Sequence, residues 1–132
     1  MNNPPLVLIV DDEPDFREIF STKLKEKGYG IEVAENGEEG FEMAKRIKPD
    51  LILMDMEMPV LNGAGSVLKL RSDPATKDIK VVFLTNYGDP RVEMRDADVH
   101  FSKEIGASDY LRKTDDLGRI ADKVKSFLSE QR

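Results

Sequence analysis

Residues Leu51–Pro59 read LILMDMEMP, and this stretch decides the fold that the sequence predicts. Four apolar residues run without interruption into one acid, Asp55, and a proline follows shortly afterwards. A short continuous apolar run is typical of a strand that is buried on both faces, as in a parallel sheet. In open α/β sheets, ligands bind outside the carboxyl ends of the strands. Asp55 therefore belongs either to a binding site or to a loop, and the rest of the chain has to decide between the two.

Strand patterns and helical patterns alternate along the rest of the chain. Apolar or alternating runs predict strands at 6–10, 29–34, 51–55, 81–84 and 108–113. Helical periods predict helices from Pro14 to a stop at Gly28, over 38–48 and 64–72, and from Asp115 onward, with one broken helix or two short ones in 87–106. In the loop after Asp55, Gly63 is expected to adopt a positive φ. The alternation implies βαβ units, and we predict an α/β fold with a parallel sheet and helices on both faces.

The composition describes an ordinary globular protein. At 132 residues, the chain suits a single domain over residues 1–132, with a core at about 5–129. The net charge of −6 disfavours nucleic acid as a direct partner, because binding to phosphates needs a basic face. The absence of cysteine excludes disulfides and thiolate sites. The apolar runs are too short for a membrane span, and Met1–Pro5 does not resemble a signal peptide, so we expect a cytoplasmic protein.

Polar side chains stand where four of the predicted strands end. The first strand ends in Asp11-Asp12-Glu13, the third in Asp55, the fourth in Thr85 and the fifth in Lys113. The carboxyl ends of parallel strands lie at one edge, so we expect these groups to converge in one cleft. Two carboxylates at ~4 Å repel each other by roughly 4 kcal/mol at an effective dielectric of about 20. A divalent cation would offset that repulsion, and Mg²⁺ binds carboxylates together with waters and phosphate oxygens.

This set of residues has the equipment for an aspartyl-phosphate intermediate. The carboxylate of Asp55 would be the nucleophile, and positioning with charge neutralisation would carry the catalysis. Each residue also has a simpler interpretation when it is taken alone. The acids at 11–13 before Pro14 could cap a helix, while Thr85 could be a plain strand end and Lys113 a solvated charge. Their joint placement favours the site.

These residues resemble the receiver domain of two-component response regulators. The likeness is carried by Asp11–Glu13, by Asp55-x-x-Met58-Pro59-x-x-x-Gly63, by Thr85 and by Lys113, and it extends over essentially the whole chain. The resemblance implies a flavodoxin-like, doubly wound sheet of five strands with the order 2-1-3-4-5.

The resemblance also implies a role for each acid. Asp55 would be the phosphoacceptor, which takes a phosphoryl group from the phosphohistidine of a sensor histidine kinase or a phosphotransfer protein. Asp12 and Asp55 would bind Mg²⁺ directly, with the backbone carbonyl of Glu57 as a third ligand and with Asp11 acting through water. The protein would catalyse only its own phosphorylation and dephosphorylation.

The remaining roles concern the response to phosphorylation. Thr85 would move to bind the phosphoryl group, Lys113 would be its counter-ion, and Tyr110 would turn inward when Thr85 moves; a half-buried strand tyrosine is the simpler reading. The output face would then change shape for a downstream protein that the sequence does not name, as a population shift biased by the new charge. We expect a monomer, or a weak dimer on phosphorylation.

Several positions depart from the family pattern or carry two readings. Thr114 stands where the family usually has proline, Asn86 stands where it usually has a small residue, and the stretch between Thr85 and Lys113 is longer than usual. The side chain of Glu57 could face the metal site or solvent. His100, the single histidine, is expected to be a surface residue rather than a phosphorelay site.

Two other functions compete with the receiver. A degenerate receiver would bind partners without phosphorylation, and Asn86 and Thr114 leave that open. A Mg²⁺-dependent phosphohydrolase would also use an aspartyl-phosphate. Against it, Asp55-Met56-Glu57 has Glu where such enzymes have a second Asp, and the acidic pair Asp11-Asp12 follows the first strand instead. A nucleotide-binding domain is weakly supported, because no glycine-rich loop follows the first strand.

Overall fold

The computed structural model describes residues 2–56, 58, 60–85 and 107–129. Strands and helices alternate from residue 6 to residue 85, as the sequence predicts, and most of the boundaries differ from the predicted ones by one or two residues. The strands are β1 (Leu6–Val10), β2 (Gly30–Ala34), β3 (Leu51–Asp55), β4 (Lys80–Thr85) and β5 (Ala107–Arg112). The helices are α1 (Pro14–Glu26), α2 (Gly37–Ile47), α3 (Gly63–Ser72) and α6 (Leu117–Ser129). The prediction for 87–106 lies outside the described residues.

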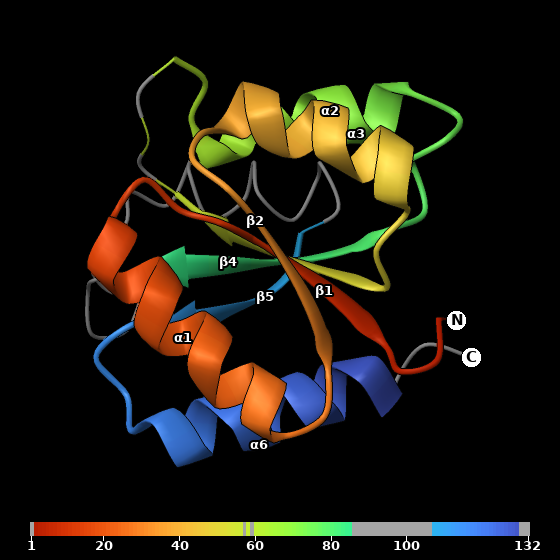
Figure 1. The fold of residues 1–132 in the computed structure, drawn as a ribbon. Helices are drawn as coiled ribbons and strands as arrows, with labels where there is room; N and C mark the ends of the chain where they lie inside the picture. The colour runs from red at the N-terminus through yellow and green to blue at the C-terminus, as the bar shows by residue number, and fades with distance from the viewer. Residues whose placement is uncertain (1, 57, 59, 86–106, 130–132) are drawn as a thin grey trace.

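All strand pairs are parallel, and the sheet order is β2-β1-β3-β4-β5. The predicted doubly wound order is therefore confirmed. Helices α1 and α6 cover one face of the sheet, and α2 and α3 cover the other (Figure 1). Each crossover returns the chain to the same edge, so every strand ends on the same side of the molecule.

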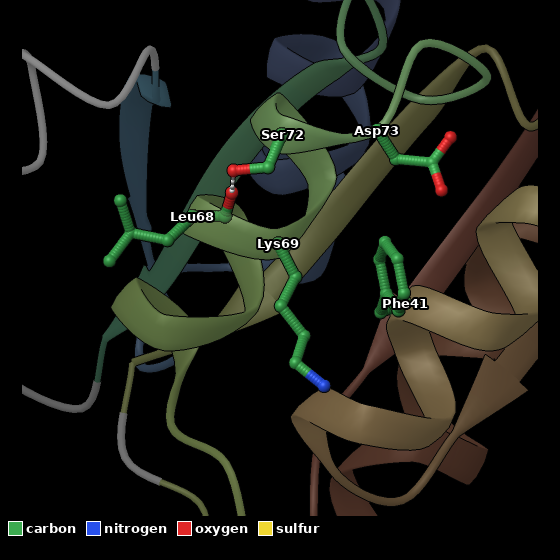
Figure 2. A pocket seen from close by; sticks show the side chains of 5 residues that line it. All are labelled: Phe41, Leu68, Lys69, Ser72 and Asp73. Atoms are coloured by element: carbon green, nitrogen blue, oxygen red, sulfur yellow. Dashed lines mark hydrogen bonds between the residues drawn. The ribbon is translucent and has the colours of Figure 1, made fainter.

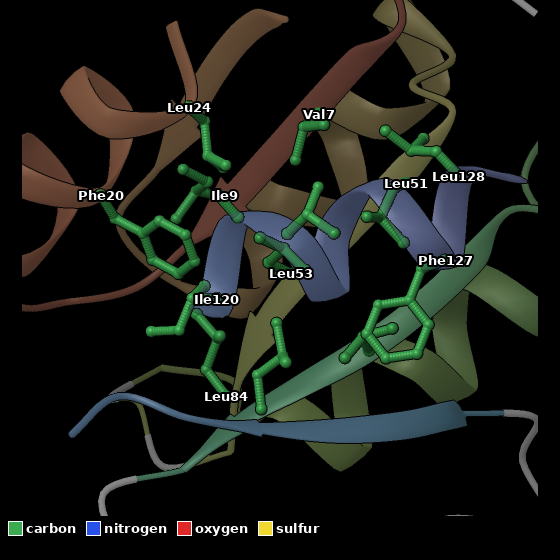
Figure 3. Packing of buried hydrophobic residues seen from close by; sticks show 14 residues of the cluster. Val7, Ile9, Phe20, Leu24, Leu51, Leu53, Leu84, Ile120, Phe127 and Leu128 are labelled. Carbon is green, nitrogen blue, oxygen red and sulfur yellow. The ribbon is translucent and has the colours of Figure 1, made fainter. Parts of the chain in front are cut away.

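The sheet separates two apolar cores, which explains the continuous apolar run of β3. Leu51 and Leu53 point into the core beneath α1 and α6, and Ile52 and Met54 point into the core beneath α2 and α3. Figure 3 shows the first core, in which the strand residues meet Phe20 and side chains of α6. A fully buried side chain of this size is worth about 1.5–3 kcal/mol. Both faces of β3 are buried, so a polar residue is tolerated only at its end.

Local signals fix where the helices begin and end. The side chains of Asn36 and Asn62 each accept a 2.8 Å hydrogen bond, from the amides of Glu39 and Gly65 respectively, and so cap α2 and α3. Gly28 has φ of 95°, as a left-handed stop after α1 requires. Within the described part of the chain, no helix combines the length and the apolar character that a membrane span demands.

The predicted positive φ of Gly63 is wrong, and glycine is needed there for another reason. Its φ is not positive; among the described residues of this loop, Val60 has the left-handed conformation, at φ 70°. Glycine is needed at 63 because a Cβ there would lie 2.4 Å from the backbone oxygen of Asp55. The amide of Gly63 donates a 3.1 Å hydrogen bond to the carbonyl of Met56, which closes the loop tightly against the end of β3.

The amino edge of the sheet has an anchor of its own. The carboxylate of Asp50, just before β3, accepts a 2.8 Å hydrogen bond from the amide of Leu6 at the start of β1. It also accepts a 3.0 Å bond from the side-chain amide of Asn2. The N-terminal segment is therefore tied to the edge opposite the ends of the strands.

Candidate functional site at the carboxyl edge of the sheet

Four carboxylates converge beyond the ends of β1 and β3. Asp11, Asp12, Glu13 and Asp55 each offer an oxygen, and these oxygens all lie within 4.8 Å of one another. The sheet register produces this convergence, because Val10 pairs with Met54 and the two strands therefore end side by side. Asp11 and Asp55 are buried, whereas Asp12 and Glu13 are exposed. The structure thus brings together the three aspartates that the sequence singles out and adds Glu13 to them.

Lys113 lies among these acids. Its Nζ is 2.5 Å from the carboxylate of Asp11, 3.0 Å from that of Glu13 and 3.3 Å from that of Asp55. The backbone places it there, because its amide donates a 2.8 Å hydrogen bond to the carbonyl of Thr85 and so extends the pairing of β4 with β5. The side chain is only 3% exposed. A buried ammonium with three carboxylate partners can also bind an anion that arrives at Asp55.

Burial and ion pairing shift the pKa values of Asp11 and Lys113. Burial raises the pKa of the Asp11 carboxyl, and hydrogen bonds from Lys113 and from the amide of Glu13, at 2.8 Å, partly oppose that rise. Burial alone would lower the pKa of Lys113, but its hydrogen bonds to Asp11 and Glu13 outweigh that effect and leave the pKa raised. The ammonium is therefore held in its charged form. One ammonium does not balance four carboxylates, so the cluster favours a further cation.

Thr85 lies at the end of β4 next to the acids, and Tyr110 lies on the neighbouring strand β5. Thr85 is buried and follows Leu84, the residue that pairs with Asp55 in the sheet. Tyr110 pairs with Phe83, and their ring centroids are 5.9 Å apart. The hydroxyl oxygen of Tyr110 is buried, so its ring points inward in this structure.

Sequence reasoning missed three contacts of the first turn of α1. The Phe16 ring centroid lies 4.8 Å from Nζ of Lys113, a cation–π distance. The guanidinium of Arg17 donates a 2.7 Å hydrogen bond to the backbone carbonyl of Asp11. Glu13 begins the helix without a side-chain capping bond and pairs with Lys113 instead. Helical spacing places Phe16 and Arg17 on the same face as Glu13, but it does not show that this face meets Lys113.

Some predicted features cannot be placed. Glu57, Asn86 and His100 lie outside the described residues. Thr114 lies in a turn that is closed by a 3.2 Å hydrogen bond from the amide of Asp115 to the carbonyl of Arg112. This turn brings the chain directly from Lys113 into α6.

Two hollows elsewhere do not include the acidic cluster. One, of about 350 Å³, lies between α2 and α3, where the Phe41 ring and the Lys69 stem face each other (Figure 2). The other, of about 360 Å³, lies between α1 and the start of α6 and is lined by Ile19 and Leu117 among others. The convergent polar chemistry is therefore at the strand ends and not in either hollow.

Comparison with known proteins assigns the chain to a family. The sequence profile of the response regulator receiver domain matches residues 7–125, and the chain belongs to this family. It is 33% identical over 124 residues to the DNA-binding dual master transcriptional regulator RpaA of Synechocystis, covering 94% of this chain and 49% of RpaA. It is 33% identical over 123 residues to the protein PilH of Pseudomonas aeruginosa, covering 93% of this chain and 97% of PilH.

The structural comparison agrees. The signal receiver domain of a signal transduction histidine kinase from Syntrophus aciditrophicus superposes with a TM-score of 0.80 at 34% identity, covering 97% of this chain and 92% of that one. The chain spans about half the length of the transcriptional regulators that it matches. It is therefore a receiver domain of two-component signalling, and the resemblance read from the sequence is confirmed.

Proposed function

We propose that this receiver accepts a phosphoryl group on Asp55 in a Mg²⁺-dependent reaction and that the phosphorylated form changes the surface offered to a downstream protein. The observation that carries the proposal is the contact between Lys113 and Asp55, at 3.3 Å, inside a cluster of four carboxylates. A nucleophilic carboxylate, a counter-ion for the phosphoryl group and a set of oxygen ligands are thus present together. The donor would be a histidine kinase or a phosphotransfer protein.

The donor set fits magnesium. Carboxylate oxygens are the ligands that this hard cation prefers, and a bound cation would offset the repulsion among the four acids. Asp12 and Asp55 would bind it directly and Asp11 through water, with the backbone carbonyl of Glu57 proposed as a ligand from the family pattern. When bound, the ion supplies positive charge to the phosphoryl oxygens during transfer.

The chemistry requires little more than alignment. One carboxylate oxygen of Asp55 attacks the phosphorus of a phosphohistidine, a new O–P bond forms, and the P–N bond breaks with its electron pair left on the imidazole nitrogen. Lys113 needs only a small movement to reach the transferred group, because it already touches Asp55. The hydroxyl of Thr85 would donate to a phosphoryl oxygen. The site would thereby stabilise charge that develops during the transfer.

The response would pass along β4 and β5. Thr85 and Tyr110 lie on neighbouring strands, and the Tyr110 ring packs on Phe83 of β4. Because the Tyr110 ring already points inward, a shift of Thr85 toward the phosphoryl group would favour this inward position over an outward one. Phosphorylation would then favour one of two arrangements by adding negative charge at Asp55.

Labelling with a small phosphodonor tests the proposal. Incubation with acetyl phosphate and Mg²⁺ should add the mass of one phosphoryl group, and Asp55→Asn should abolish that gain. Asp122→Asn, which changes an exposed aspartate of α6, should label like the wild type. Labelling that persists in Asp55→Asn would refute the assignment. Magnesium binding without labelling would support a degenerate receiver, and repeated turnover of a phosphomonoester would support a hydrolase.

The proposed partners are proteins. RpaA is described as DNA-binding, but this chain has a net charge of −6, and we propose that it binds no nucleic acid directly. A cytoplasmic location and a monomer that dimerises weakly on phosphorylation also remain predictions.

A further inference from the structure

Lys113 pairs with three carboxylates at once, and these carboxylates differ in how easily they can move away from its ammonium. The carboxylate of Asp11 is fully buried and is also held by the amide of Glu13. Asp55 is nearly buried and is itself the proposed acceptor. The Glu13 side chain, in contrast, is 51% exposed while one of its oxygens lies 3.0 Å from Nζ. Glu13 is the partner that can rotate into water without leaving a buried charge behind.

The N-cap position of Glu13 does not explain where its carboxylate lies. Glu13 is the N-cap residue of α1, and its carbonyl accepts from the amide of Arg17 at 3.0 Å. Its carboxylate makes no capping hydrogen bond with the helix. The carboxylate contacts Lys113, and the oxygens of the other three acids lie within 4.8 Å of its own.

We propose that Glu13 is a positioning residue that competes with the phosphoryl group for Lys113 and thereby weakens retention of that group on Asp55. This inference rests on the proposed function. A phosphoryl group at Asp55 brings additional negative charge next to Lys113. The ammonium of Lys113 can pair fully with the phosphoryl oxygens only when one carboxylate moves away from it. The exposed carboxylate of Glu13 can move away most easily. The charge of Glu13 also repels the phosphoryl oxygens directly.

The same carboxylate has the opposite effect on magnesium. A fourth negative charge near the metal ligands attracts a cation, so Glu13 strengthens Mg²⁺ binding while it weakens binding of an anion. Loss of this charge should move the two affinities in opposite directions. A residue with a merely structural role would shift both in the same direction or neither.

The test uses the whole chain, with Glu13→Gln as the variant and Asp15→Asn as the matched control. Asp15 is exposed in the same first turn of α1, and within the described residues it makes no ion pair with Lys113. Calorimetric titration would give the Kd of Mg²⁺ and, at saturating Mg²⁺, the Kd of beryllofluoride as a phosphoryl mimic. Exposed ion pairs are worth up to about 1 kcal/mol, so changes of about two- to fivefold are expected.

In Glu13→Gln, we expect Mg²⁺ to bind more weakly and beryllofluoride more tightly than in the wild type, and phosphorylated Asp55 to lose its group more slowly. Asp15→Asn should match the wild type for beryllofluoride. Equal beryllofluoride affinities in wild type and Glu13→Gln would overturn the inference. If the wild type itself binds no beryllofluoride and takes no label, the proposed function fails instead, so the two failures are distinct.

Discussion

Arg17 reaches back from α1 and donates a 2.7 Å hydrogen bond to the backbone carbonyl of Asp11. The amide of Asp11 donates in turn to the carbonyl of Ala34 at 3.0 Å, so the peptide groups on both sides of Asp11 are fixed. A second guanidinium nitrogen lies 3.7 Å from the carboxylate of Glu35. The loop that carries the first two acids is thus held by a side chain that binds its backbone.

Replacement of this side chain should therefore weaken metal binding. Arg17→Met removes the bond to Asp11 and frees the loop, and supporting residues of this kind typically change metal affinity by about tenfold or more. Calorimetric titration with Mg²⁺ measures the effect. Arg119→Met, at an exposed position of α6, is the control and should bind as the wild type does. Unchanged affinity in Arg17→Met would show that the loop keeps its shape without this contact.

Magnesium should stabilise the fold through Asp12. A ligand that binds only the folded state adds about 2.7 kcal/mol at 100 times its Kd. Urea unfolding with and without Mg²⁺ should show this gain in the wild type and in Asp122→Asn, and only a small part of it in Asp12→Asn. Asp12 is exposed and its loss relieves repulsion within the acidic cluster, so Asp12→Asn should not lower the metal-free stability. An equal gain in all three proteins would mean that the ion binds elsewhere.

The raised pKa of Lys113 predicts a pH dependence. Burial opposes its charge, but hydrogen bonds to Asp11 and Glu13 outweigh burial and raise the pKa above the ordinary value of 10.5. A lysine with a higher pKa in the folded state adds stability that is complete below the unfolded pKa and is lost as the pH rises through the folded pKa. The difference in unfolding free energy between wild type and Lys113→Met should therefore be constant up to about pH 10 and shrink above 10.5.

Urea unfolding between about pH 8 and 11.5 checks this window. At the lower end, Lys113→Met should be less stable by roughly 3 kcal/mol, because the buried acids lose their partner. Burial also raises the pKa of Tyr29, but that residue is present in both proteins and cancels in the difference. A difference that stays constant across the range would contradict the assignment.

Gly63 should tolerate no side chain. In Gly63→Ala the new Cβ would lie 2.4 Å from the backbone oxygen of Asp55, and backbone atoms cannot move aside cheaply. We expect a loss of about 1–3 kcal/mol and a lower rate of labelling at Asp55. Gly30→Ala is the control, because the nearest atom to its Cβ lies at 3.4 Å. Thermal unfolding and the labelling assay give both readings, and equal behaviour of the two variants would argue against the close approach.

Val60 should be replaceable with a gain in stability. Its φ of 70° suits asparagine better than a β-branched residue, and its side chain is 82% exposed, so little packing is lost. Val60→Asn should stabilise the protein by about 1 kcal/mol, as measured by urea unfolding. Val60→Thr keeps the branched shape and the strain, and it should leave stability nearly unchanged. A gain in both variants would point to polarity rather than to backbone strain.

Sequence alone predicts the sheet because its signals are local. The run from Leu51 to Met54 is apolar at every position since both faces of β3 are covered, and the acids stand at strand ends because only there can polar side chains lie outside the two apolar cores. Parallel pairing then brings Asp11 and Asp55 together without any knowledge of side-chain contacts.

The remainder of the site depends on contacts between distant segments. Nothing local to Glu13 shows that it pairs with a lysine one hundred positions later, and a helix cap is the natural reading of an acid before Pro14. Phe16 reads as a core residue until Lys113 is placed beside it. The positive φ of Val60 escapes prediction because glycine at 63 is the more obvious candidate, and only the packing against Asp55 shows why that glycine is there.

The hydrogen bonds between Asn2 and Asp50 have a practical consequence for the binding experiments. They hold the start of the chain at the far end of β3 from Asp55, about 17 Å away for a strand of five residues. An affinity handle or fluorophore attached upstream of Asn2 would emerge on the side turned away from the acids. Immobilised in that orientation, the protein would present its reactive rim to kinases and phosphotransfer proteins in solution.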